Sequence, residues 1–219
     1  MSDLPRLLVV AHGTASAAGS ATTARLVDAI RADRRAVQVD LCFLDVVEPR
    51  LPDVLDDRPT IVVPLLLSTG YHVQTDIPAA VAPYPHVRVA RHLGPDPLLT
   101  DVLLDRLPAG PDTGAVVLVG AGSTRREAAD DLAGAAALLG ARIGAPVSVL
   151  TLAEDVRAGL AARPGPLRVA TYLLTEGQFV TSIQTAADGL GAVAEPLGVH
   201  PALVRLVWQR YDEGCRAAG

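Results

Sequence analysis

The sequence of 219 residues contains an internal duplication, and this feature limits the folds that the chain can adopt. The segment LLVVAHGT at 7–14 has a counterpart in VVLVGAGST at 116–124, and PLLLSTGYHV at 64–73 has one in TYLLTEGQFV at 171–180. In each half, apolar strand patterns alternate with helix patterns, which is typical of parallel sheets covered by helices. The sequence therefore predicts two tandem α/β sandwich domains with mostly parallel sheets, at residues 1–109 and 114–219.

The run 61–67 is apolar throughout and predicts a strand that is buried on both faces. Small polar residues end it, and His72 follows in what we expect to be a loop. In open parallel sheets, ligands bind beside the loops that leave the carboxyl ends of the strands. We therefore expect a binding site at residues 68–75.

Other expected elements follow from the same alternation of patterns. In GPDPLLTDVLLDRL, Asp96 is expected to cap a helix whose first turn contains Pro97. The segment PAGPDTG at 108–114 has the composition of a linker. Further strands are expected at 7–11, 37–44 and 87–90, and further helices at 22–34 and 50–57.

Charge and composition indicate a small ligand. A net charge of −5 and an aromatic content of 3% favour neither nucleic acid nor an anionic membrane as partner. Cys42 and Cys215 lie far apart, which favours reduced thiols and a cytoplasmic protein. The first residues lack a basic signal region, and no apolar run approaches the roughly 18 residues of a membrane helix. Because the halves are fused, we expect a monomer or a weak homodimer.

Three polar residues of the first half, His12, Asp45 and His72, have no polar counterpart in the second half. The residues at the equivalent positions are Ala121, Ala153 and Phe179. The glycines and apolar strands that folding requires are kept in both halves. A single active site, located in the first half, would produce this asymmetry.

All three residues are expected at carboxyl ends of strands, and so at one edge of the first sheet. Two imidazoles and a carboxylate suit a divalent first-row metal such as Fe, Co, Ni or Zn. A structural zinc site would instead use four ligands, including thiolates. Structural alternatives remain: His12 as a turn histidine, His72 as a surface residue, and Asp45 as a plain strand end. Structural roles are expected for the other three histidines, His86, His92 and His200.

These motifs resemble the class II chelatases of the sirohydrochlorin cobaltochelatase and ferrochelatase family, in the long form with two fused halves. The resemblance is carried by AHGT at 11–14 and PLLLSTGYHVQTDIP at 64–78, with FLDVVEP at 43–49 as a weaker third motif. It implies insertion of Co²⁺ or Fe²⁺, with Ni²⁺ possible, into sirohydrochlorin or a related tetrapyrrole, without an organic cofactor. It places His12 and His72 in the metal site as catalytic residues. Asp45 stands where the family usually has Glu, with Glu48 nearby.

A tetrapyrrole with eight carboxylates requires an apolar slot and hydrogen-bond donors, which we expect in a cleft between the two domains. Backbone N–H groups at helix starts, hydroxyl groups and arginines could bind the carboxylates. Arg125 and Arg126 could equally form a solvated helix face. The residues expected to contact the macrocycle are Thr14, Ser16, Ser68, Thr69, Gly70, Tyr71, Ser123, Thr124 and Arg125.

Two other functions compete with the chelatase function. A metal or tetrapyrrole carrier would keep the pocket without turnover, and Asp in place of Glu at position 45 makes this more plausible. A nucleotide-binding protein is disfavoured, because the turns AHGTAS and GAGSTR match neither GxGxxG nor GxxxxGK[ST].

Overall fold

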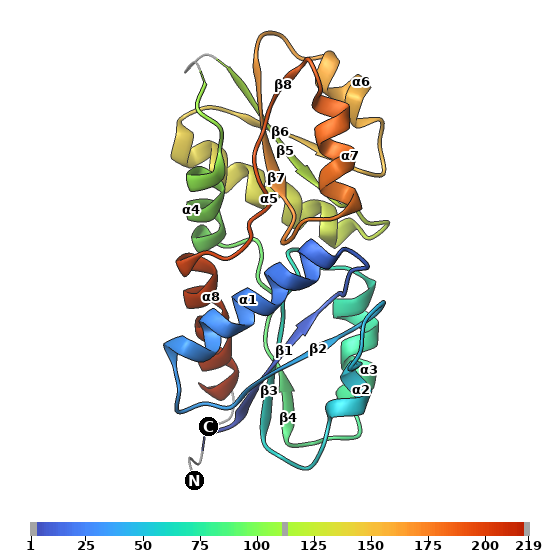
Figure 1. Ribbon diagram of the computed structural model, residues 1–219, viewed down its shortest axis with the longest axis vertical. Helices are drawn as coiled ribbons and strands as arrows, with labels where there is room; N and C mark the ends of the chain where they lie inside the picture. Colours follow the sequence, from blue (N-terminus) through green and yellow to red (C-terminus); the bar gives the residue numbers. More distant parts are fainter. Residues whose placement is uncertain (1–3, 111–113, 217–219) are drawn as a thin grey trace.

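The computed structural model describes residues 4–110 and 114–216, and it contains two parallel sheets placed end to end (Figure 1). The strand orders are β2-β1-β3-β4 and β6-β5-β7-β8, so the second sheet repeats the topology of the first. All strand pairs are parallel. The predicted fold class, two tandem α/β sandwiches with an internal duplication, is confirmed.

The elements of the first half are β1 (Arg6–Ala11), α1 (Ala17–Asp33), β2 (Val39–Phe43), α2 (Leu51–Val54), β3 (Thr60–Pro64), the π-helix η1 (His72–Asp76), α3 (Ile77–Val81), β4 (Val87–Val89) and α4 (Pro97–Arg106). Those of the second half are β5 (Ala115–Gly120), α5 (Arg126–Ile143), β6 (Val147–Thr151), α6 (Val156–Ala161), β7 (Leu167–Tyr172), α7 (Gln178–Ala187), β8 (Gly191–Val193) and α8 (Pro201–Arg216).

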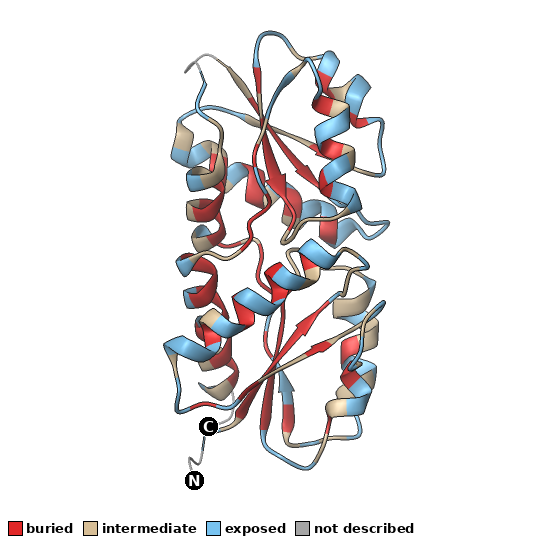
Figure 2. Cartoon of the chain, in the orientation of Figure 1, coloured by how far each residue is buried: buried red, intermediate tan, exposed pale blue. Residues whose placement is uncertain are grey.

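Each sheet is covered by helices on both faces, which explains why its central strands are apolar along their whole length (Figure 2). In the first sheet, β1 and β3 turn alternate residues to opposite faces. One face packs against α1 and α8, and the other packs against α2 and α3. In the second sheet, α4 and α5 cover one face, while α6 and α7 cover the other.

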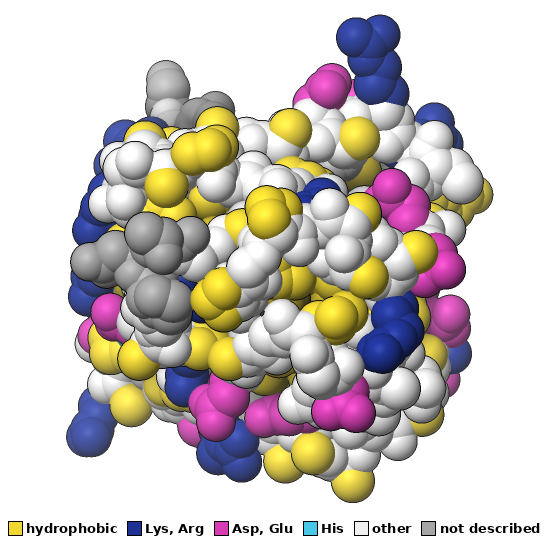
Figure 3. Space-filling model, turned by 90° about the horizontal axis from the view of Figure 1, so that it is seen from above, with side chains coloured by type: hydrophobic (Ala, Val, Ile, Leu, Met, Phe, Trp, Pro, Cys, Tyr) yellow, Lys and Arg dark blue, Asp and Glu magenta, His cyan; other side chains and the backbone are white. Residues whose placement is uncertain are grey.

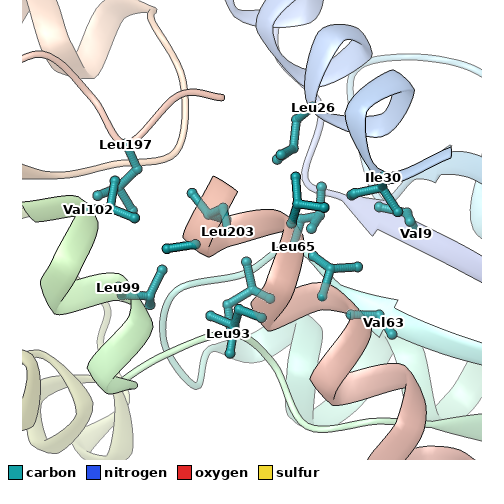
Figure 4. Packing of buried hydrophobic residues seen from close by; sticks show 14 of the residues in the cluster. Val9, Leu26, Ile30, Val63, Leu65, Leu93, Leu99, Val102, Leu197 and Leu203 are labelled. Carbon is teal, nitrogen blue, oxygen red and sulfur yellow. The ribbon is translucent and has the colours of Figure 1, made fainter. Parts of the chain in front are cut away.

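The last helix of each half packs on the sheet of the other half. Helix α4 contacts α5 and β7, whereas α8 contacts β3 and α1 (Figure 1). Leu99 and Val102 of α4 and Leu203 of α8 therefore belong to one core that continues from sheet to sheet (Figure 4). The expected domain bounds, 1–109 and 114–219, group α4 with the first sheet and α8 with the second, because local sequence patterns do not reveal which sheet a helix covers.

The segment that crosses between the halves, residues 90–96, is fixed by a buried arginine of α8. Arg210 is 0% exposed and donates hydrogen bonds to the carbonyl oxygens of His92 and Leu93 at 3.0 and 3.1 Å. It also pairs with Asp96 Oδ2 at 2.7 Å. Asp96 in turn caps α4 by accepting a hydrogen bond from the Leu98 N–H, as the sequence predicted. A buried charge pair of this kind is costly to break.

Several element boundaries differ from expectation. Helix α1 begins at Ala17, not near residue 22, because Ser16 caps it by accepting a hydrogen bond from the Gly19 N–H. Strand β3 ends at Pro64, before the apolar run does. The residue His72 begins a π-helix and does not lie in a loop.

The surface charge and the cysteines do not indicate a particular function. At the end of the molecule seen in Figure 3, acidic and basic side chains are interspersed with apolar ones. Cys42 and Cys215 are free thiols. No helix in the described part of the chain has the length and apolar character needed to cross a bilayer.

Candidate metal centre

His12 lies directly after β1, in a turn that only glycine can continue. Gly13 has a φ of +97°, and a Cβ built on it would lie 2.0 Å from the carbonyl oxygen of Asp45. The turn after β1 and the loop after β2 are therefore in close contact, and the Asp45 N–H donates to the His12 carbonyl oxygen at 2.8 Å. His12 Nδ1 lies 3.1 Å from the Gly13 carbonyl oxygen. Because a carbonyl only accepts, this contact places the proton on Nδ1 and leaves Nε2 as the lone-pair nitrogen.

His72 is held by a carboxylate one turn further along its helix. Its Nδ1 lies 2.6 Å from Asp76 Oδ2, and the His72 side chain is 29% exposed. A carboxylate partner on one ring nitrogen fixes both the tautomer and the ring orientation, and this arrangement is common for histidines that bind metals. Nε2 of His72 is thus the nitrogen available for a ligand.

The two imidazoles meet. Their ring centroids lie 4.8 Å apart, with an interplanar angle of 81°. Within the described part of the chain, neither Nε2 atom has a hydrogen-bond partner. Two nitrogen ligands at about 2.1 Å from one ion must lie within about 4.2 Å of each other. Rings at this separation can meet that requirement by small side-chain rotations. The structure therefore brings together the two predicted histidines from separate segments of the chain.

Asp45 is not arranged as a third ligand. Its Oδ1 accepts hydrogen bonds from the Val46 N–H at 2.8 Å and from Arg50 at 3.1 Å. These two partners lower the pKa of the Asp45 carboxyl. Glu48, the alternative carboxylate, also pairs with Arg50. Among the described residues, no group of three His, Cys, Asp or Glu side chains is placed to hold a metal ion. The sequence did not indicate that Arg50 would occupy both carboxylates.

Four loops at the carboxyl ends of the strands, residues 12–16, 68–72, 121–125 and 175–179, face one another across the two halves, and we call them the facing loops. A Cβ on Gly177 would lie 3.7 Å from Thr14 Oγ1 and from the Ser16 Cβ. On the other side, the Arg125 guanidinium lies 6.0 Å from the centroid of the Tyr71 ring. The Tyr71 ring centroid in turn lies 6.2 Å from that of His72. Residues of the second half thus come within reach of the histidine pair.

The other residues expected to contact the macrocycle lie in the same loops. Thr14 Oγ1 accepts a hydrogen bond from the Ser16 N–H, and Ser123 Oγ accepts one from the Arg125 N–H. The Thr69 N–H, by contrast, donates to Asp131 Oδ2. Ser68 and Gly70 are half-buried, whereas Thr124 and Tyr71 are exposed.

Phe179, the counterpart of His72, is 54% exposed and lies in the first turn of α7, at the end of a facing loop. Tyr71 is 55% exposed. Large aromatic side chains that remain exposed on both halves present apolar surface to any ligand between them.

The π-helix explains how Asp76 reaches His72. Counted along the sequence, Asp76 corresponds to Ile183, which is the fully buried residue of α7. In η1 and α3, however, the fully buried residue is Ile77, one position later. A π-helical turn contains one residue more than an α-helical turn, and such turns often occur at functional sites. The extra residue places a carboxylate beside His72. The four-residue spacing of His72 and Asp76 could have revealed this pair, but only if a helix had been expected there.

The family is indicated by the sequence of the first half. A family model named CbiX matches residues 6–109, a range that includes both histidines and all four strands of the first sheet. No curated protein matches the chain.

Solved structures establish the fold of the whole chain. SirB from Bacillus subtilis with Fe³⁺ is similar with a TM-score of 0.81 and 23% identity, over 99% of this chain and 98% of that chain. The sirohydrochlorin chelatase SirB from Bacillus subtilis subspecies spizizenii, in complex with cobalt, has a TM-score of 0.79 and 24% identity, over 97% and 96%. CbiX, described as the terminal enzyme for biosynthesis of siroheme in denitrifying bacteria, has a TM-score of 0.72 and 21% identity, over 98% and 99%. The predicted resemblance to the chelatases is thus confirmed for the CbiX segment and for the overall fold.

Proposed function

We propose that the chain is a sirohydrochlorin chelatase, which inserts Co²⁺ or Fe²⁺ into sirohydrochlorin or a related tetrapyrrole. The observation that carries the proposal is the pair His12 and His72, whose rings lie 4.8 Å apart with both Nε2 atoms unpartnered in the described structure. The CbiX match covers these residues, and two SirB structures of the same fold hold iron or cobalt.

Two imidazoles suit a metal that must be given up. Neutral imidazole nitrogen binds Fe and Co well, whereas a closed cage of four ligands would retain the ion. With two protein ligands, the remaining coordination positions stay open to the ring nitrogens of the macrocycle. The metal in this reaction is a substrate, and the protein holds it only until the macrocycle takes it.

Insertion of M²⁺ releases two protons from the pyrrole N–H groups, so a proton acceptor is required at the site. Once the metal has left, the Nε2 atoms of His12 and His72 can each accept one of these protons. The Asp76 carboxylate keeps the His72 Nδ1 proton in place, so that Nε2 serves both tasks. His12 is exposed and can pass its proton to solvent.

The macrocycle is expected to bind between the facing loops. Arg125 is expected to bind carboxylates of the substrate, together with the hydroxyl groups of Ser123 and Thr124 in the same turn. Tyr71 and Phe179 supply apolar surface from opposite halves. Because one chain supplies both sides of this site, activity does not require a dimer.

Asp45 is assigned the carboxylate position of the family, with a role in assisting proton transfer or metal capture. It is ionised at neutral pH, since its pKa is lowered by Val46 and Arg50. To act as a ligand it must exchange Arg50 for the metal. An Asp45→Glu variant, one methylene longer, should keep or raise the rate of insertion. Loss of metal binding in a folded Asp45→Glu protein would count against assigning Asp45 to the carboxylate position of the family.

A turnover experiment separates the enzyme from a carrier. Purified protein at a small fraction of the sirohydrochlorin concentration is mixed with Co²⁺, Fe²⁺ or Ni²⁺, and the absorption spectrum of the macrocycle is followed. An enzyme converts many equivalents of substrate, whereas a carrier changes the spectrum by one equivalent. A stoichiometric end point with every metal would favour the carrier function over the chelatase.

A further inference from the structure

The loop that carries His72 is held by two residues of the second half. The Thr69 N–H donates to Oδ2 of Asp131, on α5, at 2.6 Å. The hydroxyl group of Tyr172, at the end of β7, donates to the Leu67 carbonyl oxygen at 3.2 Å. These contacts fix backbone atoms only three and five residues before His72.

The Asp131 side chain, which anchors the loop through the Thr69 N–H, is itself fixed by neighbouring residues. The Asp131 side chain is 20% exposed, and its Oδ2 also lies 3.2 Å from Nε2 of His92, whose side chain is 11% exposed. Burial lowers the pKa of His92, so its ring is neutral at neutral pH and can donate the Nε2 proton to Asp131. The His92 carbonyl oxygen is itself held by the buried Arg210. A carboxylate with two donors in a half-buried position keeps one orientation.

The internal duplication shows that these contacts are not needed to build the scaffold. Along the sequence, Thr22 corresponds to Asp131 and Leu65 corresponds to Tyr172. Thr22 bonds within its own helix, to Arg25, and Leu65 is an apolar core residue. Over the described residues, no side chain of the first half forms a hydrogen bond with residues 174–178, the counterpart loop. Of these two counterpart loops, only the one beside His72 is hydrogen-bonded by side chains of the other half among the described residues.

We propose that Asp131, assisted by Tyr172, is a positioning residue that holds the 67–72 loop so that His72 meets His12. The second half, which lacks the histidines, thereby completes the metal site of the first. This inference rests on the proposed function, because it assigns to the anchored histidine the role of metal ligand. Partners that orient a ligand typically change metal affinity by about 10–100-fold when removed.

The test compares Asp131→Ala with Asp130→Ala in the full-length protein. Asp130 precedes Asp131 on the same helix, its side chain is 72% exposed, and it makes only a 3.9 Å pair with Arg126, so it controls for loss of a carboxylate. Co²⁺ binding is measured by calorimetric titration, and backbone hydrogen exchange is measured by mass spectrometry on peptides that cover 65–76. Asp131→Ala should raise the Co²⁺ dissociation constant about 10-fold and accelerate exchange in these peptides, while Asp130→Ala should change neither.

Conservative variants guard against simple unfolding. Asp131→Asn keeps an oxygen that can accept the Thr69 N–H, so it should recover most of the Co²⁺ affinity. Tyr172→Phe removes only the hydroxyl group and should have a smaller effect in the same direction. Wild-type affinity and wild-type exchange in Asp131→Ala would overturn the proposal. If that variant does not fold, wild-type affinity and wild-type exchange in Tyr172→Phe would overturn it.

A His72→Ala control separates this inference from the proposed function. If His72→Ala binds Co²⁺ as tightly as wild type, the proposed metal site fails. The exchange data then decide on the anchor alone: faster exchange of the 65–76 peptides in Asp131→Ala supports it, and unchanged exchange refutes it.

Discussion

The first and second halves of the molecule carry the same four-stranded parallel sheet, yet only the first half places imidazoles at the ends of its strands. The turns after β1 and β5 each keep a glycine with positive φ, Gly13 at +97° and Gly122 at +84°. The chemistry-bearing residue beside each glycine differs, since His12 is replaced by Ala121. Duplicated scaffold positions are thus retained for folding, while the side chains needed for metal binding are retained in one copy.

The strongest test of this comparison transfers a residue of the second half into the first. His72→Phe should reduce metal insertion by about 1000-fold, within the range for loss of a general base. Turnover of sirohydrochlorin with Co²⁺ measures the effect, and circular dichroism checks the fold. The double variant His72→Phe with Phe179→His should remain inactive, because the second half has Ala121 where His12 stands. Activity in either protein would separate the histidine pair from catalysis.

The second prediction compares the arginines at equivalent positions of α8 and α4. Arg210 is 0% exposed and pairs with Asp96, whereas the Arg106 side chain is 30% exposed and pairs with Glu195, which is 78% exposed. Arg210→Ala leaves the Asp96 charge buried and should lower the free energy of unfolding by about 3–5 kcal/mol. Arg106→Ala should cost at most about 1 kcal/mol. Chemical denaturation of both variants measures the difference, and equal losses would show that the two helix contacts are energetically alike.

A third prediction concerns the carboxylate that the extra residue of the π-helix provides. Asp76→Ala removes the partner of His72 Nδ1 and should weaken Co²⁺ binding by about 10–100-fold. The thermal midpoint should change little, because Asp76 is 40% exposed. Asp76→Asn, whose amide oxygen still accepts a hydrogen bond from the Nδ1–H group, should have a Co²⁺ affinity between those of Asp76→Ala and wild type. Unaltered Co²⁺ affinity in both variants would mean that Asp76 does not orient the ligand.

A smaller effect on stability is expected at Phe179. The sequence left open whether this residue is part of the core, in which case Phe179→Ala would cost about 3 kcal/mol or more. Its 54% exposure instead predicts a loss within about 0.5 kcal/mol, together with a higher KM for the macrocycle. Ile183→Ala, in the same helix and 0% exposed, should cost about 2–5 kcal/mol and serves as the buried control. A large loss of unfolding free energy in Phe179→Ala would show that Phe179 is part of the core.

The smallest effect is expected in the pH dependence of stability at the junction of the halves. Burial lowers the pKa of His92, and the nearby Asp131 offsets part of this shift. The unfolded chain therefore binds this proton more tightly than the folded chain. The contribution of neutral His92 to the free energy of unfolding should be fully present above the ordinary histidine pKa of about 6.5. It should be lost as the pH falls from there through the lowered pKa of the folded protein. In His92→Gln, the thermal midpoint should depend less on pH between about pH 5 and 7 than it does in the wild type. The same pH dependence in both proteins would contradict this assignment.

Local patterns were sufficient to predict the strands, the cap of α4 and the asymmetry between the halves. They predicted that His12 and His72 would share one edge of the sheet, because parallel strands end on the same side. Patterns could not predict that Arg50 forms an ion pair with Asp45, since that pairing depends on how the loop after β2 folds back. They also gave no signal for Asp131, whose partner Thr69 lies 62 residues away in the chain.

The sequence by itself determined that one type of sheet occurs twice and that the first half is chemically distinct. Strand burial and residue identity at repeated positions are properties of the chain alone. Only the tertiary structure decided that α4 and α8 exchange sheets, that a π-helical turn brings Asp76 to His72, and that the second half anchors the loop of the first. These outcomes depend on contacts between segments far apart in the chain, and the free energy of such contacts is set by packing and burial that no local pattern records.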